Sequence, residues 1–276
     1  MKHHPNLGEE ASEGLPFLIK VSLIGIFGGF LGGLLGIGGS FLVIPFLSGL
    51  LGLSSHKAHA TALPVAFASG LSALGFYSAS GHIDLKLTIP VMISSLVGVL
   101  LGTRWMKYVK GRHLSLWFGC FLLIIAAGFA LSLTTGSEGQ TGEASYSLLR
   151  SILLGLAAGI PSGLFGAGGG IIMVPGAVLL LQVAEQTAQG ISLLAIIPTT
   201  LLGTWMQYRQ GNIASKVAPY LTATAFLGGL LGGWLAVHLH GSVLKGLLIV
   251  ILLYIGIQNV WKNRPRKNTR VKEREL

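Results

Sequence analysis

The sequence predicts an all-α integral membrane protein: two inverted-topology repeats of about five hydrophobic segments, each starting with a helical hairpin broken at a Gly-rich turn. Three observations support this fold class, namely the composition, an internal duplication and the distribution of charge. The chain has 276 residues, of which 51% are hydrophobic and 10% are charged. Soluble domains carry about 25% charged residues, so the composition favours a membrane protein.

Long apolar runs account for the low charge. Residues 114–133 have no charged side chain, and residues 243–260 contain a single lysine, Lys245. Each run is close to the roughly 20 residues that a helix needs to cross the hydrocarbon core of a bilayer. The runs must be helical because lipid offers no partner for free backbone N–H and C=O groups.

An internal duplication divides the chain into two halves that align without a gap at an offset of 130 residues. The matched positions are mostly glycines, together with a proline and a Gly-x-Ile triplet. They are Gly36-Ile37-Gly38-Gly39-Ser40 with Gly166-Ala167-Gly168-Gly169-Gly170, Pro45 with Pro175, Gly81-His82-Ile83 with Gly211-Asn212-Ile213, and Gly98 and Gly102 with Gly228 and Gly232. Chance does not explain an ordered set of this kind, and internal duplication is a common plan among transporters.

Five apolar segments follow one another in the same order in each repeat. Those of repeat 1 (17–134) are 17–35, 41–53, 60–79, 87–108 and 114–134, and those of repeat 2 (147–261) are 147–165, 171–183, 188–208, 217–237 and 243–261. The short second segment follows the glycine run directly, which predicts a hairpin with its turn at the glycines. Both hairpin ends then lie on one side, whether the short arm spans fully or re-enters. Each repeat then crosses the membrane three more times, so that its two ends lie on opposite sides. The second repeat therefore starts on the other side of the membrane from the first, and the repeats must be inverted.

The charges test this inversion independently, because cytoplasmic loops carry an excess of lysine and arginine. Residues 104–113 hold four basic side chains, whereas their counterpart 234–243 holds histidines and no lysine or arginine. The linker 135–146 has two glutamates and no basic residue, whereas its counterpart, the tail 262–276, is strongly basic. We therefore expect cytoplasmic tails at 1–16 and 262–276 and an extracytoplasmic linker at 135–146.

The net charge of +10 raises the question of a nucleic-acid partner. Much of the charge lies in the tail 262–276, directly after a membrane segment, where it is typical of a topology signal or of a contact with anionic lipid. We therefore expect the lipid bilayer as a partner and no nucleic acid.

The two glycine runs are the most informative candidates for a site. Glycine permits positive φ and close approach of the backbone, and each run precedes a helix whose first N–H groups attract anions. Inverted repeats bring two such helix starts towards one central site. The candidate substrate-binding residues in the runs are Gly38, Gly39, Ser40, Gly168, Gly169 and Gly170. The alternative is helix packing, which we favour for the spaced glycines such as Gly98 and Gly102.

Polar residues at the start of the following segment are further candidates for substrate binding. They are His59, Thr61, Gln189 and Ser192, and His59 matches Gln189 at the repeat offset. Hydroxyl and amide groups can donate hydrogen bonds to the oxygens of an anion. Equally, these side chains can cap helices or bond across them, and both interpretations stay open.

The duplicated Gly-x-Gly-Gly runs, each followed by Pro45 or Pro175, resemble the TauE/SafE family of sulfite and organosulfonate exporters over residues 19–261. The resemblance implies a multi-pass protein of the bacterial cell (inner) membrane that exports small sulfur-containing or carboxylated anions. The family pattern includes a Gly-Thr-Ser-like stretch at the next helix. Here Ala60-Thr61-Ala62 and Gly190-Ile191-Ser192 replace it and remove hydroxyls.

Several function classes lack their sequence signals. The chain has no nucleotide-binding loop, no H-E-x-x-H sequence and no paired carboxylates in a predicted span, so we expect no enzyme, no cofactor and no metal site. The leading hypothesis is a secondary transporter or facilitator of a small anion. The alternative is a membrane-embedded assembly partner without transport activity, and the oligomeric state stays open.

Overall fold

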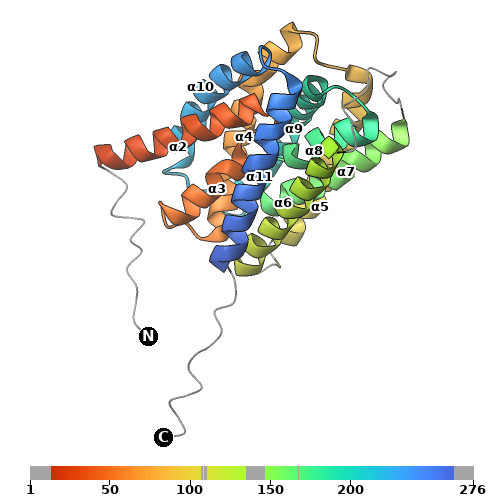
Figure 1. The fold of residues 1–276 in the computed structure, drawn as a ribbon. Coiled ribbons are helices and arrows are strands. Elements are labelled where there is room, and N and C mark those ends of the chain that lie inside the picture. Colours follow the sequence, from red (N-terminus) through yellow and green to blue (C-terminus); the bar gives the residue numbers. More distant parts are fainter. Residues whose placement is uncertain (1–13, 107, 109–110, 135–146, 167, 264–276) are drawn as a thin grey trace, which may run out of the picture.

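The computed structural model describes residues 14–106, 108, 111–134, 147–166 and 168–263. These residues form helices and no strands (Figure 1). The predicted linker 135–146 lies outside the described residues, as do most of the tail 1–16 and the tail from residue 264. We refer to residues 14–134 as the first half and to residues 147–263 as the second half.

The helices follow the predicted segments in order. In the first half they are α2 (Leu15–Leu34), α3 (Ser40–Gly49), α4 (Ser55–Ala79), α5 (Leu85–Met106) and α6 (Gly111–Thr134). In the second half they are α7 (Leu148–Phe165), α8 (Gly170–Gly176) with its π-helical continuation η2 (Ala177–Leu181), α9 (Glu185–Arg209), α10 (Ala218–Ala236) and α11 (Gly241–Asn263). Helices α4 and α9 begin and end at matching positions, 130 residues apart.

Most of these helices begin earlier than their apolar segments predict, and the two central helices show what the extra residues are. Helix α4 begins at Ser55 instead of residue 60, and α9 begins at Glu185 instead of residue 188. The extra turns are polar, and the Ser54 hydroxyl caps α4 by accepting a hydrogen bond from the Lys57 amide at 3.4 Å. Hydropathy locates the part of a helix that lies in lipid, whereas capping decides where the helix begins.

The outer surface of the bundle is apolar, as a membrane protein requires. Six helices are long and apolar enough to cross a membrane, namely α2, α4, α5, α7, α9 and the 241–258 part of α11. Leu23, Ile124 and Val250 are each more than 60% exposed, which suits contact with lipid chains. This is a multi-pass membrane protein.

Each short helix folds back along the helix before it. A Cβ atom placed on Gly39 would lie 2.0 Å from the carbonyl oxygen of Gly28 in α2, and one placed on Gly32 would lie 2.4 Å from the Gly39 nitrogen. In the second half, a Cβ on Gly169 would lie 3.2 Å from the Ala158 oxygen in α7. The chain therefore reverses at both glycine runs, which we call the first turn (residues 35–39) and the second turn (residues 166–169).

The two halves pack on each other through glycine-lined helix pairs. Helix α5 packs on α7, and α2 packs on α10 (Figure 1). A Cβ on Gly98 of α5 would lie 2.8 Å from the Gly159 Cα, and one on Gly228 of α10 would lie 2.2 Å from the Ile26 oxygen. These backbone contacts confirm the packing interpretation of the spaced glycines. At the centre α4 packs on α9, and these two helices carry the polar candidates.

Candidate functional site

The matched glycines of the two turns share a left-handed backbone conformation. Gly36, Gly38 and Gly39 have φ angles of 68°, 78° and 67°, and their counterparts Gly166, Gly168 and Gly169 have 62°, 71° and 80°. An L-residue in this region costs about 1–2 kcal/mol, so glycine is required by the geometry of the turn. The duplicated sequence motif thus encodes a duplicated left-handed turn.

Both turns lead into helices whose starts lack a side-chain cap. Gly39 is the N-cap of α3 and Gly169 is the N-cap of α8, and neither cap provides a side-chain hydrogen bond. The first N–H groups of a helix have no partner inside the helix. No side chain of either N-cap satisfies these donors, although the third amide of each helix, that of Leu42 or Ile172, bonds back to the cap carbonyl oxygen.

The two turns meet in the interior of the molecule. A Cβ placed on Gly168 would lie 3.3 Å from Ser40 Oγ, and one placed on Gly170 would lie 2.5 Å from the Cα of Ile37. Ala66 of α4 touches both turns, because a Cβ on either Gly38 or Gly168 would lie 3.1 Å from the Ala66 Cβ. Residues 130 positions apart in the chain are thus neighbours at the centre of the bundle.

The turns are closed on one another in this conformation. The five side chains predicted to bind substrate are all fully buried, namely Ser40, His59, Thr61, Gln189 and Ser192, each at 0% exposure. The backbone contact between Gly170 and Ile37 leaves no room for an ion between those two residues. Binding between the turns therefore requires a conformation in which they move apart.

His59 and Gln189 each close the turn of the opposite half. The ring Nδ1 of His59 donates a hydrogen bond to the Phe165 carbonyl oxygen, immediately before the second turn, and a Cβ on Gly166 would meet the His59 backbone oxygen. Gln189 lies against the first turn, since a Cβ on Gly36 would lie 2.4 Å from the Gln189 Cβ. The structure thus brings both residues to the turns, each through contacts across the halves.

Thr61 and Ser192 differ in their surroundings. Thr61 Oγ1 accepts a hydrogen bond of 3.0 Å from the Ala214 amide, in the loop between α9 and α10. Ser192 Oγ and Ser40 Oγ are buried and have no hydrogen-bond partner within the described part of the chain. Buried polar groups are nearly always hydrogen-bonded, so Ser40 and Ser192 are the candidates whose hydroxyls are available to a ligand, whereas that of Thr61 is already engaged.

Two polar residues at the turns were not predicted. Ser69 Oγ donates a 2.7 Å hydrogen bond to the Gly38 carbonyl oxygen, and the Tyr77 hydroxyl lies 3.2 Å from the carbonyl oxygens of Gly33 and Leu34. Both residues are polar side chains inside an apolar span. The repeat pairs Ser69 with Thr199 and Tyr77 with Gln207, and this shared polarity was the signal that could have identified them.

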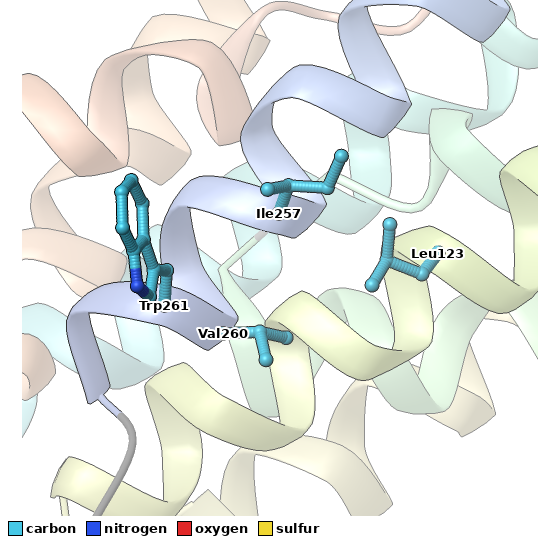
Figure 2. Close-up of a pocket in the computed structure, with 4 residues that line it drawn as sticks. All are labelled: Leu123, Ile257, Val260 and Trp261. Carbon is cyan, nitrogen blue, oxygen red and sulfur yellow. The ribbon is translucent and has the colours of Figure 1, made fainter.

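A separate pocket lies between α6 and α11, away from the turns. Figure 2 shows its lining by Leu123 of α6 and by Ile257, Val260 and Trp261 of α11. Apart from the indole N–H of Trp261, these side chains offer no hydrogen-bond donor to an anion. This pocket is therefore distinct from the candidate site at the turns.

Comparison with known proteins gives one family over nearly the whole chain. The model of a family described as sulfite exporter TauE/SafE matches residues 2–129 and 151–276. The probable membrane transporter protein YunE of Bacillus subtilis is 26% identical over 270 residues, which cover 90% of this chain and 98% of that protein. A probable membrane transporter protein of Methanocaldococcus jannaschii is 31% identical over 204 residues, covering 72% of this chain and 73% of that protein. No solved structure matches the chain.

Proposed function

The chain belongs to the sulfite exporter TauE/SafE family, and from this premise we propose that it is a secondary transporter or facilitator of a small anion. The proposed substrates are sulfite, an organosulfonate or a related small sulfur or carboxylate anion, moved outward. That the chain is a membrane transporter follows from the family and from the names of its relatives. The proposal that its substrate is an anion is based on the structure of the two turns.

The observation that supports an anionic substrate is the meeting of two helix starts that lack a side-chain cap. Helices α3 and α8 begin at glycine N-caps without side-chain hydrogen bonds, and the two turns touch the same residue, Ala66. Bare N–H groups and the positive ends of helix dipoles favour a negative ligand. In the proposed open state, Gly38-Gly39-Ser40 and Gly168-Gly169-Gly170 replace part of the ion's hydration shell, and the hydroxyls of Ser40 and Ser192 donate to it.

We propose a different role, without direct contact to the anion, for the remaining candidates. His59, Thr61 and Gln189 hold the turns and the neighbouring loop through hydrogen bonds across the halves. We propose that they reorganise when the turns separate, so that binding of the anion and opening of the site occur together.

We also propose that the two halves are inverted repeats, comprising residues 17–134 and 147–261. The matching boundaries of α4 and α9 support duplication, and the unequal content of lysine and arginine in equivalent loops supports opposite orientation. The proposed topology places both tails in the cytoplasm, with the basic tail 262–276 against anionic lipid. Alternating access then follows from opening the turns towards one side of the membrane at a time.

Flux through reconstituted protein tests the function directly. Proteoliposomes that contain the purified chain are expected to show saturable flux of at least one member of a panel of labelled sulfite, sulfoacetate, alkanesulfonates and small carboxylates. Gly39→Leu and Gly169→Leu are expected to abolish this flux because they fill the turns. Gly75→Leu is the matched control, because a Cβ at Gly75 meets nothing within 4 Å.

The outcomes separate the hypotheses. Flux that survives in both turn variants contradicts the proposed binding site at the turns, but it agrees with the conclusion that the protein is a transporter. Absence of flux across the whole panel, with folded protein in the vesicles, contradicts anion transport and favours an assembly partner.

A further inference from the structure

Two ionisable side chains lie where the start of α9 meets the start of α11, with Glu185 partly buried and Lys245 buried. Glu185 begins α9, and Lys245 lies in α11 with 5% exposure. Lys245 acts on Glu185 electrostatically, and its Nζ lies 5.0 Å from the centre of the Phe129 ring. Ionisable groups within membrane helices are expensive and mark ion or proton pathways. The transport mechanism proposed above does not use either of them.

A continuous chain of hydrogen bonds connects Glu185 to the first turn. Glu185 Oε1 accepts from Gln189 Nε2 at 3.5 Å, and Gln189 Oε1 accepts from the Tyr77 hydroxyl at 2.9 Å. The same hydroxyl lies 3.2 Å from the carbonyl oxygens of Gly33 and Leu34 at the end of α2. Every link in this chain is buried or partly buried.

The Tyr77 hydroxyl gives the chain two states. A phenol has one proton to donate, and the structure offers it both the Gln189 amide oxygen and the two carbonyl oxygens of α2. A change at Glu185 that reorients the Gln189 amide therefore changes which acceptor the hydroxyl serves. Because Gln189 also packs against Gly36, this change reaches the backbone of the turn directly.

The carboxyl group has no counterpart in the other half. The repeat offset pairs Glu185 with Ser55, Gln189 with His59, and Tyr77 with Gln207. One oxygen of Glu185, Oε2, is buried without a hydrogen-bond partner within the described residues. An ionised oxygen in that position has lost its water without replacement, and a proton on it would remove the charge.

We propose that Glu185 is the proton-binding group of the anion site, so that one proton binds at Glu185 when one anion binds between the turns. This inference rests on the proposed function and names the coupled ion. A negative ion arriving at the turns repels the carboxylate, and protonation removes that repulsion. The carboxylate takes a proton from solvent to become a carboxylic acid, and no electron is transferred. In the described part, Lys245 from α11 acts electrostatically on Glu185, and Glu185 in turn acts on Tyr77 from α4.

The linkage between proton binding and anion binding fixes the direction and the upper limit of the change in anion affinity with pH. Coupling between two ligands is reciprocal, so the affinity for the anion must rise as the pH falls. With one linked proton, the dissociation constant changes by at most about tenfold per pH unit. Glu185→Gln carries the uncharged form permanently and is expected to bind the anion with the affinity that the wild type reaches at low pH.

Calorimetric titration of the purified full-length protein with methanesulfonate, over a range of pH, tests the proposal. Methanesulfonate is suitable because its charge does not change in that range. The wild type is expected to show pH-dependent affinity and to take up a proton on binding. Glu185→Gln is expected to lose both effects while keeping tight binding, and Tyr77→Phe is expected to weaken the pH dependence. Asp84→Asn, which neutralises an acid in the loop before α5, is the control and should match the wild type.

Each outcome decides a separate claim. Affinity that is independent of pH in the wild type, or that keeps its pH dependence in Glu185→Gln, overturns the linkage and leaves the anion site intact. Absence of binding at every pH contradicts the anion site itself and the linkage with it. If Glu185→Gln lost binding together with thermal stability, Glu185 would be a structural ion-pair partner and the proposal would be wrong.

Discussion

Individual atoms decide which substitutions the turns accept. Gly39 and Gly169 occupy equivalent positions with positive φ, yet their surroundings differ. A Cβ at Gly39 would overlap the Gly28 carbonyl oxygen at 2.0 Å, whereas at Gly169 the nearest atom, the Ala158 oxygen, is 3.2 Å away. Equivalent residues of the two halves are therefore under unequal steric constraint.

This difference gives a prediction for alanine substitutions. Gly169→Ala is expected to lower the free energy of unfolding by about 1–2 kcal/mol, the cost of a left-handed L-residue. Gly39→Ala is expected to cost clearly more, because α3 must also move away from α2. Thermal unfolding in detergent measures both. Gly211→Ala isolates the conformational cost, since Gly211 has φ of 69° and a Cβ there meets nothing within 4 Å. Equal losses at Gly39 and Gly211 would show that the overlap is unimportant.

A second prediction concerns Ser69. Its hydroxyl bridges α4 and the Gly38 carbonyl at 2.7 Å, whereas the Thr199 hydroxyl bonds to carbonyls of its own helix. Ser69→Ala is expected to cost about 1 kcal/mol and to alter anion affinity, because the bond holds the first turn. Thr199→Val should leave the affinity unchanged, as measured by the same binding titration. Identical affinities in Ser69→Ala and wild type would contradict this role.

The limits of sequence reasoning at this scale follow from the partners involved. The turn glycines were predictable because their backbone conformation requires one residue type. The hydrogen-bond partners of Thr61 and Ser69 were not predictable, since they are the Ala214 amide and the Gly38 carbonyl. Every residue has an amide or a carbonyl, so sequence carries no mark of such a pairing.

At the scale of elements, hydropathy and duplication predicted the order of the helices. Their irregularities came from elsewhere: α3 ends at Gly49, before the predicted end of its segment at residue 53, and the equivalent arm of the second half widens from α8 into the π-helical η2. Gln182, with φ of 56°, ends that arm. Apolar composition does not distinguish α-helical from π-helical hydrogen bonding, so these features depend on tertiary packing.

The glycine-lined helix pairs give a prediction at this scale. Gly98→Leu and Gly228→Leu are each expected to lower stability by more than about 3 kcal/mol, because both side chains would enter the backbone of the facing helix. Gly128→Leu is the control, since a Cβ at Gly128 meets nothing within 4 Å. The yield of monodisperse protein and its thermal midpoint measure the effect. Tolerance of either leucine would show that the helices can separate without loss of the fold.

At the scale of the whole molecule, the orientation of the halves is the central claim. The segments and their order could be predicted from the sequence, because lipid imposes a length and an apolar character on each span. The meeting of the two turns was predicted from the proposed inversion and not from any local pattern. The closure of the turns could not be predicted, because one sequence is compatible with both a closed and an open conformation.

Labelling of matched cysteines tests the orientation. Ser80 and Gln210 are exposed, lie 130 residues apart and follow the ends of α4 and α9. In a background that lacks the single cysteine, Cys120, inversion predicts that Ser80→Cys reacts with an impermeant thiol reagent from outside the cell. Gln210→Cys is expected to react after the membrane is opened. Labelling of both from the same side would show that the repeats are parallel.

The crossed contacts of His59 and Gln189 have a consequence for the folding of each half. Each turn is covered in part by the opposite half: the carbonyl before the second turn is bonded by a side chain from the first half, and the first turn rests on a residue of the second. A half on its own would lose these contacts at its turn. Cutting this polypeptide within the linker is therefore expected to leave two fragments that need each other to fold.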